Sequence, residues 1–360
     1  NPYKGLRAFE EADAADFYGR EALIRRLREV LVRRTGSRLV VLAGPSGSGK
    51  SSVVKAGLIP VLRGDGWSIA TTFPGEEPLE ALESAVDALE AQSRSVLIVD
   101  QLEELITLAP ESSQQEFLDR LAELATTGDY LWVVATVRAD FLDRLLIHPR
   151  FARLVEPALV LVTPLEDHEV RDVIAAPASR VGATVEPDLV AAMVRDVAQR
   201  AAALPLLEYA LTDLYDRAGG GPLTLHALEA AGGISGALVK RAEELYAGLD
   251  EAGRTTARQL FLRLVTLTDE GEALRRRVAT ASMAGLPNVD EVLSIFGQHR
   301  LVTFDRNRAG EPTVEVAHEA LLSEWPRVAQ WIDEARASIR MLRQLNDATS
   351  EWESHDRADA

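Results

Sequence analysis

Residues 44–51, Gly-Pro-Ser-Gly-Ser-Gly-Lys-Ser, constrain the fold of this 360-residue chain more than any other segment. They match the pattern G-x-x-x-x-G-K-[ST] without exception, and an uninterrupted apolar run over residues 39–43 precedes them. Glycines in such a turn let backbone N–H groups close around phosphate oxygens, and the positive end of a following helix points at the same place. The segment therefore predicts a strand, a phosphate-binding loop (P-loop) and a helix in succession.

Two side chains of this loop have expected roles of their own. Lys50 would reach the β- and γ-phosphates of a nucleotide, and the Ser51 hydroxyl would hold Mg²⁺. A glycine-rich turn without a ligand is the alternative, which the complete motif in this context disfavours. The predicted nucleotide-binding residues of the segment are Gly44, Ser46, Gly47, Ser48, Gly49, Lys50, Ser51 and Ser52.

Strand-sized apolar runs alternate with helical patterns over the first 162 residues. Alternation of this kind is typical of a parallel sheet with helices on its faces, since a parallel strand is buried on both sides. The predicted fold class is α/β, with a P-loop NTPase sheet. The expected strands are 39–43, 67–73, 95–99, 130–137 and 158–162, and the clearest helical patterns are 21–34, 79–89 and 114–124.

The third of these strands ends in Asp100, as expected of a Walker B element, where the carboxylate would bind the Mg²⁺ shell through water. An activating base should follow within a residue or so, but position 101 is glutamine. Glu103 and Glu104 are therefore the candidates, and the sequence does not decide between them. The alternative is that both glutamates are the solvated start of a helix.

Another polar group follows the strand over residues 130–137. Arg138 lies where strands of α/β proteins present ligand-contacting residues, and a guanidinium there can distinguish a terminal phosphate from its absence. A surface pair between Arg138 and Asp140 is the alternative.

After Val162 the strand pattern stops, and helical patterns follow. Thr163 to Glu166 read as an N-cap, a proline at the first helical position and a capping box, so a helix is expected to begin there. Helices followed by a two-stranded hairpin at 301–305 and 313–317 predict a winged helix. The expected domains are a nucleotide-binding domain at 1–162, a helical lid at 163–235, a winged helix at 236–334 and a C-terminal helix at 335–360.

Taken together, several separate motifs resemble the bacterial novel STAND NTPases, signal-transduction ATPases related to AAA+ proteins. The resemblance covers essentially the whole chain. It implies a switch that ADP holds off between the nucleotide domain and the winged helix, that oligomerises with ATP, and that is flanked by effector and repeat sensor domains. The motifs are residues 1–9 (NPYKGLRAF), 17–21 (FYGRE), the P-loop, 99–105 (VDQLEEL), 138–141 (RADF) and 316–322 (VAHEALL).

The resemblance also implies roles for residues outside the P-loop. Tyr18, Gly19 and Arg20 would line the adenine pocket, although an ordinary helix entry is the alternative. Pro205 would contact the adenine from the lid, but the glycine usual before this proline is absent, so Pro205 could simply start a lid helix. His318 would donate a hydrogen bond to the β-phosphate of ADP, with a structural histidine as the alternative.

Composition narrows the remaining choices. The net charge of −17 repels phosphate backbones and argues against direct nucleic-acid binding, and the chain has no cysteine and no apolar run near the roughly 20 residues that cross a bilayer. We expect the protein to be cytoplasmic, and the resemblance implies an ATPase with weak hydrolysis that uses ATP/ADP and Mg²⁺. A DNA-binding transcriptional regulator driven by ATP is the alternative function. A kinase is disfavoured, because the sequence shows no acceptor site with a catalytic base.

Overall fold

The structure, a computed structural model, describes residues 1–32, 38–75, 77–90, 93–127, 130–198, 203–268, 271–299, 301–306, 311–337 and 341. It divides into two compact units. One contains Ala8–Pro177, and the other contains Asn1–Arg7 together with Ala178–Ala360. The predicted four-domain boundaries remain a prediction.

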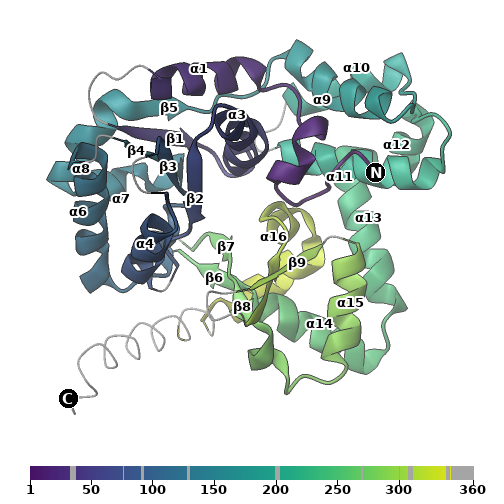
Figure 1. Cartoon of the computed structure of the whole chain (residues 1–360). Coiled ribbons are helices and arrows are strands. Elements are labelled where there is room, and N and C mark those ends of the chain that lie inside the picture. Colours follow the sequence, from purple (N-terminus) through teal and green to yellow (C-terminus); the bar gives the residue numbers. More distant parts are fainter. Residues whose placement is uncertain are drawn as a thin grey trace. The chain divides into compact units, whose positions relative to one another are not determined.

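The unit formed by residues 8–177 contains a five-stranded parallel sheet with the order β2-β3-β4-β1-β5 (Figure 1). All five expected strands are present, because continuous apolar runs of this length suit strands that are covered on both faces. Their bounds are β1 Leu39–Gly44, β2 Ser68–Thr72, β3 Ser95–Val99, β4 Leu131–Arg138 and β5 Leu159–Leu161. The predicted α/β fold class with a P-loop NTPase sheet is confirmed.

The register of the sheet brings the functional segments to one edge. Gly44 at the end of β1 pairs with Arg138 at the end of β4, and Val99 at the end of β3 pairs with Ala135. Because the strands are parallel, the P-loop, Asp100 and Arg138 all leave the sheet at its carboxyl edge, where open α/β sheets bind ligands. Every residue of β1 and β3 is buried, so the positions of these segments are fixed by the core.

The helix after the P-loop changes its winding. It begins as α2 (Lys50–Ser52), widens to a π-helix, η2 (Val53–Leu58), and continues as α3 (Ile59–Gly64). Pro60 lacks the N–H that an α-helix would use at this point, and the Ile59 N–H bonds the Val54 carbonyl five residues back. The sequence reading predicts the helix but not this wide turn.

Short 3-10 and α-helices complete the first unit. Helices α1, α4 and α6 overlap the three expected helical patterns. The bounds are η1 Glu11–Asp16, α1 Glu21–Val32, α4 Pro78–Asp87, α5 Glu104–Thr107, α6 Glu111–Thr127, η3 Ala139–Phe141, α7 Leu142–Leu146, α8 Pro149–Val155, η4 Glu156–Ala158 and α9 Asp167–Arg180, which runs past Pro177 into the other unit.

The expected helix start at residues 163–166 is wrong. Helix α9 begins at Asp167, and the backbone N–H of Glu166 bonds the Glu169 carboxylate at 2.8 Å. The side chain three residues into the helix therefore reaches back to the residue before it, which is one half of a capping box placed three residues later than predicted.

The other unit begins with five helices and includes the first seven residues of the chain. The predicted starts at Pro187 and near Leu204 are confirmed. Tyr3 is fully buried, and the Lys4 backbone N–H bonds the Glu208 carboxylate on α11 at 3.2 Å. The helices are α10 Pro187–Ala198, α11 Ala203–Ala218, α12 Leu225–Ala231, α13 Gly233–Gly248 and α14 Glu251–Arg263.

Short strands and helices form the rest of this unit, and the winged helix remains a prediction. After α14 come a short hairpin, a strand, a 3-10 turn, a helix and a second hairpin, and β8, β10 and β9 form a three-stranded sheet in this order. The hairpin β6-β7 and strand β8 are absent from the sequence prediction. The bounds are β6 Val265–Leu267, β7 Ala273–Arg275, β8 Val278–Ala279, η5 Thr280–Met283, α15 Val289–Gln298, β9 Val302–Arg306, β10 Pro312–Val316 and α16 Ala320–Glu324.

Aromatic side chains form the core of this part of the unit. Trp325 is fully buried and packs its ring against Phe261, Phe296 and Trp331, with centroid distances of 5.3, 6.1 and 5.9 Å. The apolar side chains of Leu321, Leu322, Trp325, Val328, Trp331 and Ile332 are therefore core.

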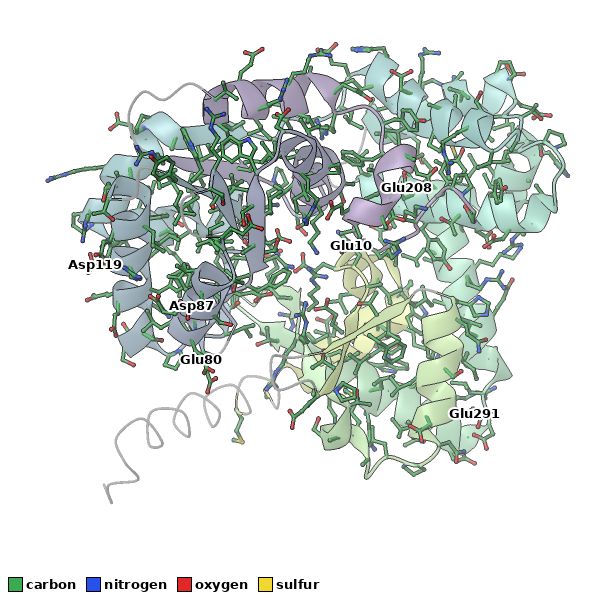
Figure 2. The ribbon with its side chains drawn as sticks, viewed as in Figure 1. Glu10, Glu80, Asp87, Asp119, Glu208 and Glu291 are labelled. Carbon is green, nitrogen blue, oxygen red and sulfur yellow. The ribbon has the colours of Figure 1, made fainter. Side chains whose placement is uncertain are left out.

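Acidic side chains are exposed on the helices that cover the first unit's sheet. Glu80 and Asp87 on α4 and Asp119 on α6 all lie in solvent (Figure 2). These three carboxylates are thus solvated. Within the described part of the chain, no helix combines the length and apolarity that a membrane crossing needs.

Candidate nucleotide-binding site

The lysine of the P-loop folds back over its own loop. The Lys50 Nζ donates to the carbonyl oxygens of Gly44 and Pro45, at 2.9 Å in both cases. Gly44 is required by close packing, since a Cβ there would lie 2.9 Å from the Ser48 Oγ and 3.1 Å from the Val162 carbonyl oxygen. These two hydrogen bonds hold the ammonium group beside its own loop.

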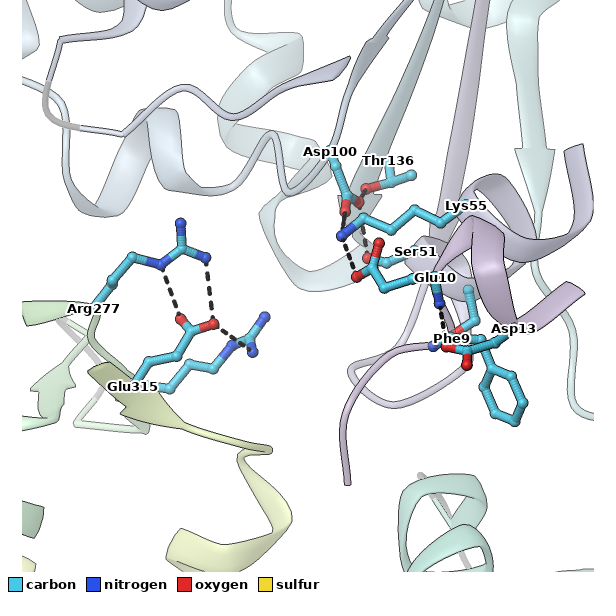
Figure 3. Close-up of polar contacts among 11 residues, drawn as sticks. Phe9, Glu10, Asp13, Ser51, Lys55, Asp100, Thr136, Arg277 and Glu315 are labelled. Atoms are coloured by element: carbon cyan, nitrogen blue, oxygen red, sulfur yellow. Dashed lines mark hydrogen bonds and ion pairs between the residues drawn. The ribbon is translucent and has the colours of Figure 1, made fainter. Parts of the chain in front are cut away.

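The Asp100 carboxylate accepts hydrogen bonds from two hydroxyl groups. Its Oδ1 accepts hydrogen bonds from the Ser51 hydroxyl at 2.8 Å and from the Thr136 hydroxyl at 2.6 Å (Figure 3). The Thr136 oxygen in turn accepts from the Gln101 backbone N–H at 2.9 Å. Asp100 is buried, and its carboxylate is held between strands β3 and β4 and the P-loop helix.

These groups fit the Mg²⁺ site that the motifs predict. The second carboxylate oxygen, Asp100 Oδ2, is buried and has no hydrogen-bond partner among the described residues. A buried carboxylate oxygen without a donor is costly, and a hard cation with oxygen ligands satisfies it. The described residues contain no cluster of three or more acidic or histidine ligands. Ser51 and Asp100 would therefore hold the ion together with phosphate oxygens and water.

Glu103 contacts the end of strand β4. Its Oε2 accepts the backbone N–H of Arg138 at 3.1 Å. Burial raises the pKa of the Glu103 carboxyl, and the neighbouring Lys50 ammonium opposes this shift without cancelling it. A carboxylate with a raised pKa is a stronger base. Glu104 opens helix α5, and both glutamates are partly exposed, so the choice between them as the activating base remains a prediction.

Arg138 is paired within its own strand end. Its guanidinium forms two hydrogen bonds with the Asp140 carboxylate, at 3.1 Å from Nε and 2.7 Å from Nη2. The pairing expected under the alternative reading is therefore present, but Arg138 itself is buried. Burial raises the pKa of Asp140, and the Arg138 guanidinium more than reverses that and leaves it lowered. Asp140 remains charged and holds the guanidinium beside the site.

The segment Tyr18-Gly19-Arg20 packs against the P-loop. Arg20 is buried and donates to the carbonyl oxygens of Ser48 at 3.1 Å and Thr163 at 2.9 Å. Gly19 has φ +81°, and a Cβ there would lie 2.8 Å from the Glu169 carbonyl oxygen. Tyr18 is partly exposed. The structure thus places these residues between the loop and helix α9, and their adenine contact remains a prediction.

The other predicted loop residues lie on the same turn. Gly47 and Gly49 have positive φ of 71° and 89°, and Ser46 and Ser48 are partly exposed. The hydroxyl of Ser52 is engaged elsewhere, because it accepts the backbone N–H of Phe9 at 3.1 Å. This contact ties the segment before η1 to the P-loop helix.

Two predicted residues belong to the other compact unit. Pro205 is buried in the first turn of α11. His318 follows β10, and its Nδ1 accepts the backbone N–H of Ala320 at 3.1 Å. A neutral imidazole that accepts at Nδ1 carries its proton on Nε2, the tautomer that can donate a hydrogen bond outward.

Comparisons with known proteins agree with these motifs. The family model described as Novel STAND NTPase 1 matches residues 2–360. The chain belongs to this family. As a member, it is a nucleotide-dependent P-loop NTPase. No curated protein sequence matches the chain.

Solved structures of limited similarity cover most of this novel STAND NTPase. The Aeropyrum pernix ORC1 protein in complex with DNA is 17% identical, with TM-score 0.48, and the match covers 90% of this chain and 94% of that one. CDC6P from Pyrobaculum aerophilum is 13% identical, with TM-score 0.41 and coverages of 88% and 94%. A Thermotoga maritima RuvB variant is 16% identical, with TM-score 0.44 and coverages of 89% and 98%.

Sequence reasoning missed three residues at the site of this novel STAND NTPase. Thr136 contacts Asp100 directly, and its only signal is a hydroxyl near the end of an apolar strand. Lys55 and Glu10 form an ion pair of 3.0 Å beside the same carboxylate. Lys55 lies four residues after Ser51 and therefore on the same helix face, which is the signal that could have found it.

Proposed function

We propose that this chain is an ATP- and ADP-operated signal-transduction switch with slow ATPase activity. One observation carries the proposal. The Ser51 hydroxyl of the P-loop and the Thr136 hydroxyl of β4 both donate to the buried carboxylate of Asp100, and the Lys50 ammonium group contacts the carbonyl of Gly44 in the loop. This is the arrangement that binds the phosphates and the Mg²⁺ ion of a nucleotide.

Each residue has a role in this proposal. Lys50 binds the β- and γ-phosphates, and Ser51 and Asp100 hold Mg²⁺, whose charge offsets that of the phosphates. Glu103 accepts a proton from the attacking water, because its burial makes it a stronger base than an exposed glutamate. Arg138 contacts the γ-phosphate from its position beside Asp140.

The silent state would depend on both units. Tyr18, Gly19 and Arg20 would bind the adenine together with Pro205 from the lid at residues 163–235. His318 would donate from Nε2 to the β-phosphate of ADP from the winged helix at residues 236–334, and its contact with Ala320 supports this tautomer. Exchange of ADP for ATP would release these contacts and permit oligomerisation.

The identity of the bound nucleotide tests the switch. We expect protein purified without added nucleotide to release ADP on acid extraction, and ADP to raise the melting temperature of stripped protein. Phosphate release from ATP should be slow. Absence of extracted nucleotide, together with no thermal shift at millimolar ATP or ADP, would contradict the proposal.

The alternative of a DNA-binding regulator is weakened by ion pairs in the second unit. Arg275 and Arg277, from the basic run at 275–277, both lie beside the Glu315 carboxylate, at 3.6 and 3.3 Å. Figure 3 shows the pair of Arg277 and Glu315. The helix α15 carries Asp290 and Glu291 in its first turn. The Glu315 carboxylate offsets part of the positive charge of this basic run and reduces its attraction for phosphates. A salt-dependent gel shift with this chain alone would revive the alternative.

A further inference from the structure

The Walker B carboxylate has one satisfied oxygen and one unsatisfied oxygen. Asp100 Oδ1 accepts two hydroxyl hydrogen bonds, whereas Oδ2 is buried and has no hydrogen-bond partner among the described residues. The Lys55 Nζ lies 3.9 Å from Oδ2 (Figure 3). That distance is within ion-pair range but too long for a hydrogen bond. The oxygen is therefore electrostatically compensated and still available to a ligand.

Lys55 has a second, closer acidic partner. Its Nζ donates to the Glu10 Oε1 at 3.0 Å and lies 5.4 Å from the centre of the Phe73 ring. The two carboxylates differ sharply in environment, since the Asp100 side chain is 1% exposed and the Glu10 side chain is 54% exposed. One ammonium group thus stands between a buried site and the solvent.

We propose that Lys55 is a positioning residue that stands in for the divalent cation at Asp100 when the site lacks one, with Glu10 as the partner to which it withdraws. The proposal rests on the proposed function and adds a control of Mg²⁺ affinity to it. A buried carboxylate without a counter-charge is strongly destabilising. Lys55 removes that cost in the absence of Mg²⁺ and must give up its place when the ion binds.

This competition gives Lys55 and Glu10 opposite effects on Mg²⁺ binding. Removal of the Lys55 charge leaves Asp100 open to the ion, so affinity rises. When the Glu10 charge is removed, only Asp100 remains of the two acidic partners of Lys55. Lys55 then holds Asp100 more firmly, and the affinity for Mg²⁺ falls. A phosphate-binding lysine would behave differently, because its loss would weaken the whole Mg²⁺–nucleotide complex.

Titration of MgCl₂ into the complex of the full chain with ADP, freed of excess nucleotide, measures this affinity calorimetrically. We expect Lys55→Met to tighten Mg²⁺ binding about tenfold, which corresponds to about 1.4 kcal/mol, and Glu10→Gln to weaken it about threefold. The double variant should resemble Lys55→Met alone, since Glu10 acts only through Lys55.

A neighbouring ion pair provides the matched control. Arg63 of helix α3 pairs with Glu11 at 2.7 Å, one residue from Glu10, but neither contacts Asp100 among the contacts described. Arg63→Met and Glu11→Gln make the same changes in net charge and should leave the Mg²⁺ affinity unchanged. Equal shifts in the control variants, or an unchanged or weaker affinity in Lys55→Met, overturn the proposal.

A measurement without nucleotide separates this proposal from the function on which it rests. In EDTA, Lys55→Met should lower the melting temperature of stripped protein, and Asp100→Asn should remove that loss in the double variant. Additive effects of the two changes overturn the stand-in role even if ADP binds normally. If the effects of the two changes are coupled but the wild-type protein binds no ADP, the switch and the competition with Mg²⁺ are overturned instead.

Discussion

The Thr136 hydroxyl on β4 donates to the Asp100 carboxylate at the end of β3, with an oxygen–oxygen distance of 2.6 Å. Both residues are fully buried. Because the same hydroxyl accepts the Gln101 backbone N–H, it fixes both the carboxylate and the left-handed backbone that follows it, where Gln101 has φ 57°. One side chain without a predicted role thus positions the Walker B aspartate.

Replacement of this hydroxyl should affect function and stability together. Thr136→Val keeps the shape of the side chain and removes a hydrogen bond to a charged group, so we expect a loss of about 1.5–3 kcal/mol in the free energy of unfolding. Mg²⁺-dependent nucleotide affinity should fall as well. Thr72→Val is the control, since the Thr72 hydroxyl is buried at the end of β2 but bonds the Ala81 carbonyl. Its effect should be confined to stability, as chemical denaturation and ADP titration can show.

Glu103 should give ATP hydrolysis a dependence on pH. Its pKa is raised above the ordinary value near 4.5 by burial, so the basic form is lost as the pH falls through that raised value. Hydrolysis should decline in the same range, and Glu103→Gln should abolish it with ATP binding retained. Glu104→Gln, one residue away, should hydrolyse ATP at the wild-type rate.

The same shift has a consequence for stability. Between the unfolded and folded pKa values the folded chain binds more protons, so the free energy of unfolding decreases as the pH rises through this window. Glu103→Gln removes the ionisable group and should reduce that decrease. Urea denaturation of both proteins across the window measures it, and identical pH profiles would contradict the raised pKa of Glu103.

Much of the fold was predictable from the sequence, because the signal for each strand lies within the strand's own segment. Continuous apolar runs mark parallel strands wherever these lie in the sheet, so all five were found. The strands β6, β7 and β8 contain only two or three residues each, too few to show a period. The start of α9 was misplaced because Pro164 and Glu166 imitate a capping box that the chain forms later.

The contacts of the site depend on information that no local pattern contains. Asp100 meets Thr136 because β3 lies beside β4, and the strand order is a property of the whole sheet. Lys55 meets Glu10 because the segment before η1 crosses the P-loop helix, where the Phe9 N–H also bonds Ser52. The motif residues themselves were found because their chemistry is tied to short spacings.

Gly19 should be intolerant of a side chain. It has φ +81°, and an added Cβ would lie 2.8 Å from both the Glu169 carbonyl oxygen and the Val173 Cγ2. Gly66 has nearly the same φ, +80°, but an added Cβ there meets nothing within 4 Å. We expect Gly66→Ala to cost about 1 kcal/mol from backbone strain and Gly19→Ala about 2–4 kcal/mol, since overpacking adds to the strain. Thermal and urea denaturation of the two variants compare these costs directly, and equal losses would show that helix α9 yields to the methyl group.

Lys50 should be indispensable for nucleotide affinity. Backbone N–H groups alone do not balance the charge of a triphosphate, so Lys50→Ala should weaken ATP binding by at least a hundredfold, measured calorimetrically. Lys240→Ala removes one exposed positive charge from helix α13 and controls for the change in net charge. Unchanged ATP affinity in Lys50→Ala would contradict the phosphate-binding role of the loop.

His318 should stabilise the ADP-bound form if its Nε2 donates to the β-phosphate. The contact with the Ala320 backbone N–H sets the tautomer, and loss of one hydrogen bond to a charged group costs about 1–3 kcal/mol. His318→Ala should therefore release ADP about 5- to 150-fold faster and self-associate more readily, as stopped-flow fluorescence and light scattering can measure. His226→Ala, at an exposed position on α12, is the matched control and should retain ADP. A His318→Ala protein that keeps its ADP and stays monomeric would assign the histidine to capping the turn before α16 and to nothing more.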